Sequence, residues 1–326
     1  MNSFRVDSCL FCRLTSNVYT FIMKALTNKW GIGKMNDLGL IDIGGTSIKM
    51  AVMQNQKLKK LPSIPTPKTL EEFYSALSEN VAKMKSEYQI KGVGISSPGA
   101  VNKKTGVIEG ASAIPYIHNF KIQQALSDKF GLPVSMENDA NCAALAELDS
   151  GAGKNVSSLL FLIIGTGVGG SVIVNHKIWH GAHLFGGEFG YTLVDDKNIL
   201  SNLATSVGVA KRYNKTSQPK TNYSGREVFD LANQGDIRAQ KEVQTMYSSL
   251  AKGIYNLQYS FDPELIVLGG AVSNNPYLIP EVDKEIEKIR QIVKIASIKP
   301  KIVPCEYTDE ANLRGAYVDF CQTYPD

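Results

Sequence analysis

The sequence predicts an α/β protein built from two similar lobes. Its 326 residues exceed the size of one typical domain, which is about 100–200 residues. Short apolar strands alternate along the chain with segments of helical periodicity, as in proteins whose helices pack on sheets. An apolar strand, a Gly/Thr turn and a second apolar strand occur twice, at 40–52 and at 160–174. This internal echo predicts two lobes of one plan with a cleft between them.

Composition and charge exclude several classes of protein. With 43% hydrophobic and 20% charged residues, the chain is neither disordered nor a disulfide-stapled miniprotein. The net charge of +4 falls entirely within residues 1–34, so the remaining chain has no excess positive charge for nucleic acid. Five scattered cysteines are typical of a reducing compartment, and no apolar run approaches the ~20 residues that cross a bilayer. We expect a cytoplasmic protein that binds a small molecule, with no nucleic acid or membrane partner.

Residues 1–34 show neither helical nor strand periodicity. The apolar patch at 18–23 is too short for a signal-peptide core. Cys9 and Cys12 have the spacing of half a zinc site, but no second pair follows them. We interpret 1–34 as a disordered tail or as sequence upstream of a start at Met35. The predicted lobes are then 35–150 and 151–326, with the final helix packing back on the first lobe.

The first lobe is predicted to open with a β-hairpin. Apolar strands at 40–43 and 48–53 flank a turn of Gly44, Gly45 and Thr46. Backbone N–H groups in such a turn can point outward, and phosphate oxygens can come close where Cβ atoms are missing. The turn is therefore a candidate phosphate cradle, although an ordinary hairpin fits the local sequence equally well.

An amphipathic helix follows the hairpin. Thr69 and Glu72 have the spacing of a capping box, and apolar residues then recur at intervals of three and four. These residues are Leu70, Phe73, Leu77, Val81, Met84 and Tyr88. Beyond them, a buried strand at 92–96 ends in Ser97-Pro98-Gly99, and a short helix closes at Gly131.

Asp139 is the best candidate for chemistry. A strand at 134–136 leads through Glu137 and Asn138 to Asp139, and a helix is predicted at 140–148. Asp139 then lies at the carboxyl end of a strand, where open α/β sheets gather ligands. A carboxylate in that position can accept the proton of a hydroxyl group during phosphoryl transfer. The structural alternative is that Asp139 is only a helix N-cap.

The second lobe repeats the pattern of strand, glycine turn and strand. The strand at 159–164 ends in Gly165-Thr166-Gly167-Val168-Gly169-Gly170, and 171–174 resumes it. A Walker A loop is excluded because no Gly-Lys-Ser/Thr follows, and a dinucleotide fingerprint because no helix follows. The remaining elements are a helix over 243–257, a strand at 265–268 that ends in Gly269 and Gly270, and a helix beginning near Pro280.

Three further acids and bases are candidates for binding. Asp42 precedes the first turn and can help hold a hydrated Mg²⁺, or it can simply cap the turn. Lys49 can reach a phosphate, or it is a solvated strand residue. Glu188 lies among glycines and aromatic residues, where it can accept two sugar hydroxyls or be a surface turn acid. No further ligand accompanies the nearby histidines, so we expect solvated loop side chains and no metal at His176, His180 and His183.

Taken together, six segments resemble the ROK family of sugar kinases, repressors and related open reading frames. In the family's order they are 41–46, 94–101, 137–141, 165–170, 187–190 and 268–270, and the resemblance spans about 38–320. It implies an actin-like sugar kinase fold of two ribonuclease H-like lobes, with ATP and Mg²⁺ in the interdomain cleft. It also implies a homodimer.

The resemblance also implies roles for individual residues. Asp139 matches the catalytic base, which deprotonates a sugar hydroxyl, usually the 6-hydroxyl, for attack on the γ-phosphate. The implied sugar-binding residues are Asn138 and Glu188, together with Gly99 and Tyr191, which lie in segments that match the family. The implied nucleotide side consists of Gly44, Gly45, Thr46, Lys49, Gly165, Thr166, Gly167, Gly269 and Gly270, with Asp42 near Mg²⁺.

Two departures from the family pattern affect the expected substrate. Tyr191 replaces the usual histidine, and no cysteine lies between Cys142 and Cys305, so no zinc is expected. The usual glutamate of the zinc loop aligns with Ser201. The sequence is thus similar to zinc-less N-acetylmannosamine kinases and β-glucoside kinases. The loss of two polar ligands near the first and second carbons of the sugar is compatible with an N-acetyl group or with an aglycone at that place. We expect an N-acylhexosamine or a plain hexose as substrate.

Two other functions compete with an ATP-dependent sugar kinase. Family repressors carry a winged-helix domain in front of a similar body and often lose the catalytic Asp. The 34 aperiodic residues cannot build such a domain, and Asp139 is present. An inactive sugar-binding protein is the third hypothesis, because two of the family's sugar ligands are missing.

Overall fold

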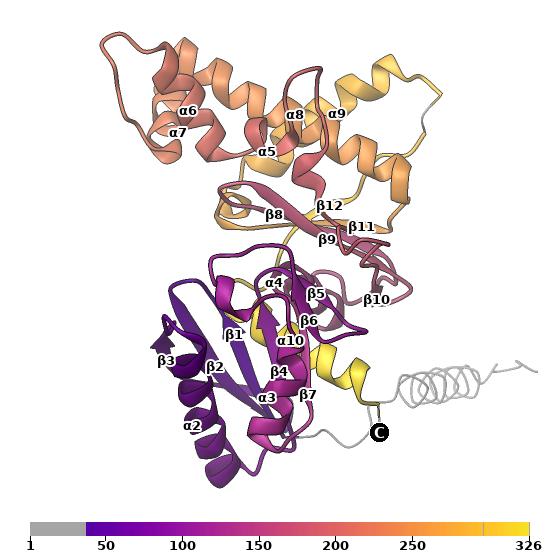
Figure 1. Cartoon of the computed structure of the whole chain (residues 1–326). Coiled ribbons are helices and arrows are strands. Elements are labelled where there is room, and N and C mark those ends of the chain that lie inside the picture. The colour runs from indigo at the N-terminus through magenta and orange to yellow at the C-terminus, as the bar shows by residue number, and fades with distance from the viewer. Residues whose placement is uncertain (1–36, 296, 326) are drawn as a thin grey trace, which may run out of the picture.

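Two five-stranded sheets frame the part of this computed structural model that is described, residues 37–295 and 297–325 (Figure 1). The first sheet has the order β3-β2-β1-β4-β7, and the second has the order β10-β9-β8-β11-β12. In chain order the first contains β1 (Leu38–Ile43), β2 (Ser47–Gln54), β3 (Lys57–Pro65), β4 (Gly92–Ser97) and β7 (Val134–Asn138). The second contains β8 (Leu159–Ile164), β9 (Val168–Val174), β10 (Lys177–Ile178), β11 (Leu265–Gly269) and β12 (Ile302–Pro304). The predicted α/β class is confirmed, and one sheet plan is used twice.

Helices lie outside both sheets and between them (Figure 1). The outer face of the first sheet is covered by α2 (Leu70–Tyr88) and α3 (Ile122–Phe130). The outer face of the second is covered by α5 (Leu200–Leu203), α6 (Ser206–Thr216), α7 (Gly225–Asn233), α8 (Ile237–Phe261) and α9 (Leu278–Ile292). The middle layer consists of α4 (Asp139–Asp149) and α10 (Ala311–Thr323). Short elements complete the chain: β5 (Ala100–Asn102), β6 (Val107–Glu109), η1 (Pro115–Ile117), η2 (Phe189–Tyr191) and η3 (Ala271–Asn274).

Strand β1 is buried on both faces because its side chains alternate between two helical layers. Leu38 and Leu40 pack with Leu313 and Phe320 of α10, whereas Ile41 packs with α2 on the opposite face. Successive side chains of a strand point to opposite faces, so a strand with helices on both sides must be apolar throughout. The carboxyl end of this strand, which carries Asp42, is thereby fixed against α10.

The middle layer approaches its neighbours so closely that only glycine fits at two positions. A Cβ atom on Gly94 of β4 would lie 2.4 Å from the carbonyl oxygen of Ala316 in α10. A Cβ atom on Gly315 would lie 1.7 Å from the carbonyl oxygen of Cys142 in α4. The other side of α4 packs on the second sheet, where Leu145 contacts the cluster of Phe161. The two sheets are therefore joined through α10 and α4.

Most predicted elements are confirmed, with differences at their ends. The Oγ1 of Thr69 caps α2, but the Glu72 carboxylate accepts from the N–H of Lys68 and not from that of Thr69, so the capping box is half formed. Strand β7 continues two residues beyond 136 to Asn138, and β9 resumes at Val168, so the second turn has only three residues. Helix α9 begins at Leu278, two residues before Pro280.

Two other expectations concern residues 1–34 and the absence of a membrane-spanning segment. Residues 1–34, with Cys9 and Cys12, lie outside the described residues. Among the helices that the structure describes, none is both long and apolar enough to cross a bilayer.

Candidate active site

The carboxyl ends of three parallel strands bring Asp42, Ser96 and Glu137 into one row. Asp42 of β1 pairs with Ser96 of β4, which pairs with Glu137 of β7. The buried Oδ1 of Asp42 accepts hydrogen bonds from Ser96 Oγ at 2.8 Å and from Asn312 Nδ2 at 3.0 Å. Its second oxygen accepts no hydrogen bond from the described residues, which leaves it available to a hydrated cation. Within residues 37–295 and 297–325, no three His, Cys, Asp or Glu side chains are arranged around a metal site.

Asp139 is the first residue of α4, and the N-cap is its neighbour Asn138. The Oδ1 of Asn138 accepts from the backbone N–H groups of Ala140 and Asn141, at 2.9 and 3.2 Å. The N-cap alternative for Asp139 is therefore wrong, although one of its oxygens also accepts from Ala140 at 2.8 Å. Burial raises the pKa of the Asp139 carboxyl, and the negative charge of Asp42 raises it further. A carboxylate with a raised pKa is a better proton acceptor.

Gly99 holds the side chain of Asn138 in place. The Nδ2 of Asn138 donates to the carbonyl oxygen of Gly99 at 3.0 Å, and a hydrogen bond from the Asn138 side chain to the Asp139 carboxylate opposes the rise in the pKa of Asp139. Gly99 has φ of +92°, and a Cβ atom there would lie 2.7 Å from Ile108 and 2.8 Å from His118. A larger residue would be both strained and crowded at this position. Two predicted sugar-side residues, Gly99 and Asn138, are thus in direct contact.

Glu188 comes from the second half of the chain and faces the first. It precedes η2 in a loop held down by Gly187, where a Cβ atom would lie 2.4 Å from the carbonyl oxygen of Gly170. Glu188 is exposed as a residue, but partial desolvation of its carboxyl raises its pKa, and the charge of Asp139 raises it further. The two carboxylates are therefore electrostatic neighbours. Tyr191 follows on η2 with 66% of its surface exposed.

The two glycine turns present the same set of unused donors. In each, the first N–H closes the turn: Gly44 donates to Ser47 at 3.1 Å, and Gly165 donates to Gly167 at 2.9 Å. In the described part of the chain, the next two N–H groups of both turns have no hydrogen-bond acceptor. They belong to Gly45, Thr46, Thr166 and Gly167, and both threonines are exposed. These N–H groups and hydroxyls can bind phosphate oxygens.

Four further residues from the sequence analysis lie at different places relative to the turns. Gly270, with φ of +89°, packs against the carbonyl oxygen of Ile164, directly beside the second turn, and Gly269 pairs with Ile163. Ser201 accepts a hydrogen bond from the N–H of Val168 at 3.0 Å, so its Oγ stabilises the second turn. Lys49 lines a surface cavity of about 300 Å³ with Lys60 and Asp309.

His180 was expected to be a solvated loop residue, and this expectation is wrong. Its Nε2 lies 2.8 Å from Oε2 of Glu137, whose side chain is 1% exposed. The hydrogen bond that His180 donates to the Glu137 carboxylate is the main cause of the raised pKa of His180. A signal was present in the sequence, because an acid inside a buried strand needs a charged or hydrogen-bonding partner. His183, three residues further on, is exposed.

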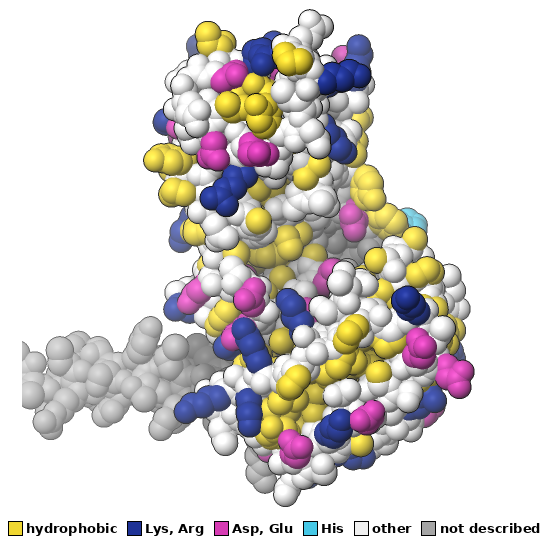
Figure 2. All heavy atoms as spheres, turned by 90° about the vertical axis from the view of Figure 1, so that its left-hand side faces the viewer, with side chains coloured by type: hydrophobic (Ala, Val, Ile, Leu, Met, Phe, Trp, Pro, Cys, Tyr) yellow, Lys and Arg dark blue, Asp and Glu magenta, His cyan; other side chains and the backbone are white. Residues whose placement is uncertain are grey.

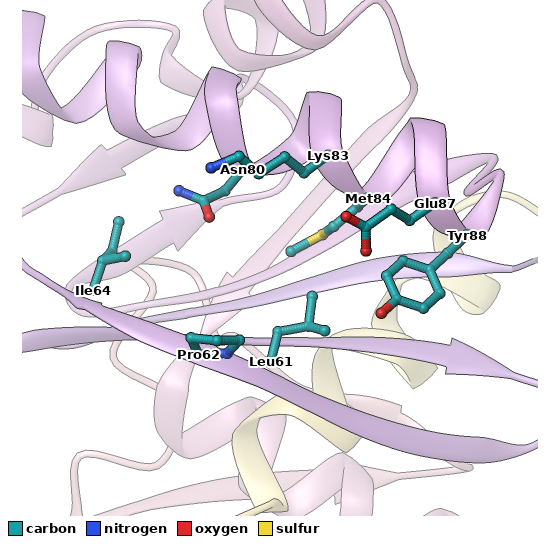
Figure 3. A pocket seen from close by; sticks show the side chains of 8 residues that line it. All are labelled: Leu61, Pro62, Ile64, Asn80, Lys83, Met84, Glu87 and Tyr88. Atoms are coloured by element: carbon teal, nitrogen blue, oxygen red, sulfur yellow. The ribbon is translucent and has the colours of Figure 1, made fainter.

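A cavity elsewhere has no connection with these residues. It also has a volume of about 300 Å³ and lies between β3 and α2, where Asn80, Lys83 and Glu87 face Leu61 and Ile64 (Figure 3). None of the predicted site residues lines it. In the space-filling view, the surface is instead hollowed where the upper and lower parts of the molecule meet (Figure 2).

Comparisons with known proteins match almost the whole described chain to a single protein family. The model of the ROK family matches residues 38–322. A β-glucoside kinase of Listeria monocytogenes is 31% identical over 87% of this chain and 97% of its own length. An N-acetyl-D-glucosamine kinase of Haemophilus influenzae is 32% identical over 85% of this chain and 96% of its own length. The crystal structure of a ROK family protein from Streptococcus pneumoniae in complex with sucrose is similar with a TM-score of 0.79 and 40% identity, over 88% of this chain and 98% of that chain. This likeness confirms the predicted two-lobed sugar kinase fold.

Proposed function

The chain belongs to the ROK family, and we propose that it is an ATP-dependent kinase of a hexose or hexose derivative. One observation carries this proposal. Asp139 from the first half and Glu188 from the second are electrostatic neighbours, while each half also contributes a glycine turn with unused N–H donors. Kinase-named relatives that align over almost their full length support the same activity.

In the proposed reaction, Asp139 is the general base. Its carboxylate accepts the proton of the sugar hydroxyl, the hydroxyl oxygen forms a bond to the γ-phosphorus, and the bond from that phosphorus to the bridging oxygen of ADP breaks. The N–H groups and hydroxyls of the two turns bind the phosphate oxygens on which charge develops. Mg²⁺, when bound, neutralises phosphate charge, and the free oxygen of Asp42 is the group that fits it.

The proposed sugar ligands are Glu188 and the side chain of Asn138. The attacking group is proposed to be the 6-hydroxyl of a hexose or an N-acylhexosamine. A glycoside is the second candidate substrate. It is supported by the β-glucoside kinase of Listeria, by the sucrose bound to the Streptococcus relative, and by the exposure of Tyr191.

The remaining parts of the proposal concern organisation. We place the lobes at 35–150 and 151–326, with α4 and α10 as the layer where they meet. We further propose a cytoplasmic homodimer that binds both substrates in the cleft between its lobes. A ROK-type repressor or an inactive sugar-binding protein is the alternative that the following experiment separates.

The test measures ADP release with Mg-ATP and single sugars. The panel consists of glucose, N-acetylglucosamine, N-acetylmannosamine and cellobiose, with a reaction lacking sugar as the control. We expect sugar-dependent ADP release with at least one of them, and a 6-phosphate as product by ³¹P NMR. Absence of turnover with every sugar would contradict the kinase proposal. Sugar binding without turnover would support an inactive sugar-binding protein, and sugar-sensitive binding to DNA fragments would support a repressor.

A further inference from the structure

A contact between Glu137 and His180 joins the two halves of the chain, two residues before the proposed base Asp139. Glu137 belongs to β7 of the first sheet, and His180 follows β10 of the second. Their side chains meet at 2.8 Å, with 1% of Glu137 and 26% of His180 exposed. A buried carboxylate without a partner is costly, so this contact restricts where the His180 loop can lie.

The other oxygen of Glu137 accepts hydrogen bonds from the junction of β7 and α4, which carries the proposed base. Its Oε1 accepts from the backbone N–H of Asn138 at 2.7 Å and from Nδ2 of Asn141 at 2.9 Å. Asp139 lies between these two residues. One carboxylate therefore bonds both to His180 and to the residues on either side of Asp139.

The backbone of His180 is bonded to the loop that carries Glu188. The carbonyl oxygen of His180 accepts from the N–H of Gly186 at 2.9 Å, and a Cβ atom on Gly186 would lie 2.3 Å from the carbonyl oxygen of Trp179. Trp179 in turn donates its N–H to Val172 of β9 at 2.8 Å. The segment is thus tied to the second sheet on one side and leads within two residues of Gly186 to Glu188.

The surrounding charges leave His180 as the partner that Glu137 needs. Lys103, between β5 and β6, contacts both oxygens of Asp319 in α10, at 2.6 and 2.8 Å, and also the carbonyl oxygen of Met136. Asp319 is therefore neutralised by Lys103. The second buried carboxylate, Glu137, has its short contact with His180, and Lys103 acts on Glu137 only through the longer-range attraction of opposite charges.

We propose that His180 is a positioning residue of the kinase: through Glu137 it fixes Glu188 relative to Asp139, and so it sets the affinity for the sugar and not for ATP. This inference rests on the proposed function. Loss of the contact between Glu137 and His180 would release the Glu188 loop from the junction of β7 and α4, where Asp139 lies. Both glycine turns and Gly270 would keep their own contacts. A role in folding alone would instead lower stability without distinguishing the two substrates.

The test compares His180→Ala and His180→Gln with two matched controls. Gln keeps an N–H donor for Glu137, so it is the conservative variant. Glu147→Gln changes another buried carboxylate, on α4, which accepts the N–H groups of Ala152, Glu306 and Tyr307 and has no contact with the proposed site. His183→Ala changes the exposed histidine of the same loop.

For His180→Ala we expect a sugar KM at least tenfold above that of the wild type, with the KM for ATP within twofold. The sugar KM of His180→Gln should lie, on a logarithmic scale, no more than halfway from the wild-type value to that of His180→Ala. Glu147→Gln should lower the melting temperature with both KM values within twofold, and His183→Ala should behave as the wild type. A sugar KM within twofold of the wild type in His180→Ala would overturn the proposal, as would equal increases in both KM values.

The outcome can be separated from that of the proposed function. Turnover by the wild type decides whether the chain is a kinase. If the wild type binds a sugar of the panel without phosphorylating it, the same variants are compared by calorimetric titration with that sugar. A tenfold weaker binding by His180→Ala would still support the positioning role, and unchanged binding would overturn it.

Discussion

The two sheets have the same strand order, but their carboxyl edges supply different chemical groups. The first edge carries the carboxylates of Asp42 and Asp139 on side chains, whereas the second offers backbone groups at 165–167 and Gly270. The glycine hairpin is common to both. The repeated frame thus provides two matching glycine turns, which are the proposed phosphate sites, whereas the proposed base belongs to a segment in which the repeats differ.

The largest expected effect comes from removing the acid of the first edge. Asp139→Asn keeps the shape and removes the proton acceptor, so kcat should fall by about 10²–10⁴-fold, measured by ADP release, with little change in the KM for ATP. The folded-state pKa of Asp139 is raised, so its ionised form destabilises the fold at neutral pH. The melting temperature of the variant at pH 7 should therefore equal or exceed that of the wild type. A variant that keeps wild-type kcat would contradict the role of Asp139.

A smaller effect is expected from the acid that the second half contributes. Glu188→Gln removes the charge that strengthens hydrogen bonds to sugar hydroxyls, which is worth roughly tenfold or more in kcat/KM for the sugar. The KM for ATP should stay within twofold. If the KM for ATP rises instead, Glu188 belongs to the nucleotide site, and its assignment to the sugar site is wrong.

The two turns allow a direct test of their equivalence. Thr46→Val and Thr166→Val each remove one hydroxyl donor of similar exposure, and each should raise the KM for ATP by about fivefold, since a hydrogen bond contributes about 1 kcal/mol. The sugar KM should not change. An effect confined to one of the two variants would show that only one hairpin binds phosphate.

The smallest expected effect is a shift in pH dependence. Activity should fall as the pH drops through the pKa of Asp139, because the base must be ionised. Asp42 raises that pKa, so Asp42→Asn should move the acid limb of the kcat/KM profile to lower pH, whatever it does to the maximal rate. An acid limb that stays in place or moves upward would show that Asp42 does not act on the base.

The sequence was sufficient for the parts of the fold that depend on local patterns. The hairpin at Gly44, the helix capped by Thr69 and the strand before Gly269 follow from turn chemistry and apolar periodicity. Helix ends are less well determined by sequence: Asn138 and Asp139 are both good N-cap residues, and the structure selects Asn138. Asp139 still accepts the N–H of Ala140 with one oxygen, so its place as first residue of the helix restrains its side chain as well.

Contacts between distant segments could not be derived from one sequence. Gly94 and Gly315 are required because the backbone of α10 lies directly against β4 and that of α4 against α10. The residues around each glycine do not indicate these close contacts. The contact between Glu137 and His180 could not be predicted for the same reason, since 43 residues separate the two side chains. Ser201 aligned with a lost sugar ligand, yet it bonds to the second turn.

The central claim is that both glycine turns bind one ATP while Asp139 faces the sugar hydroxyl. A crystal structure with a nonhydrolysable ATP analogue and the preferred sugar tests it most directly. The account predicts the γ-phosphate between residues 44–46 and 165–167, with the attacking hydroxyl at hydrogen-bond distance, ~2.6–3.2 Å, from the Asp139 carboxylate. A γ-phosphate bound away from both turns, or a sugar whose hydroxyls all lie far from Asp139, would contradict it.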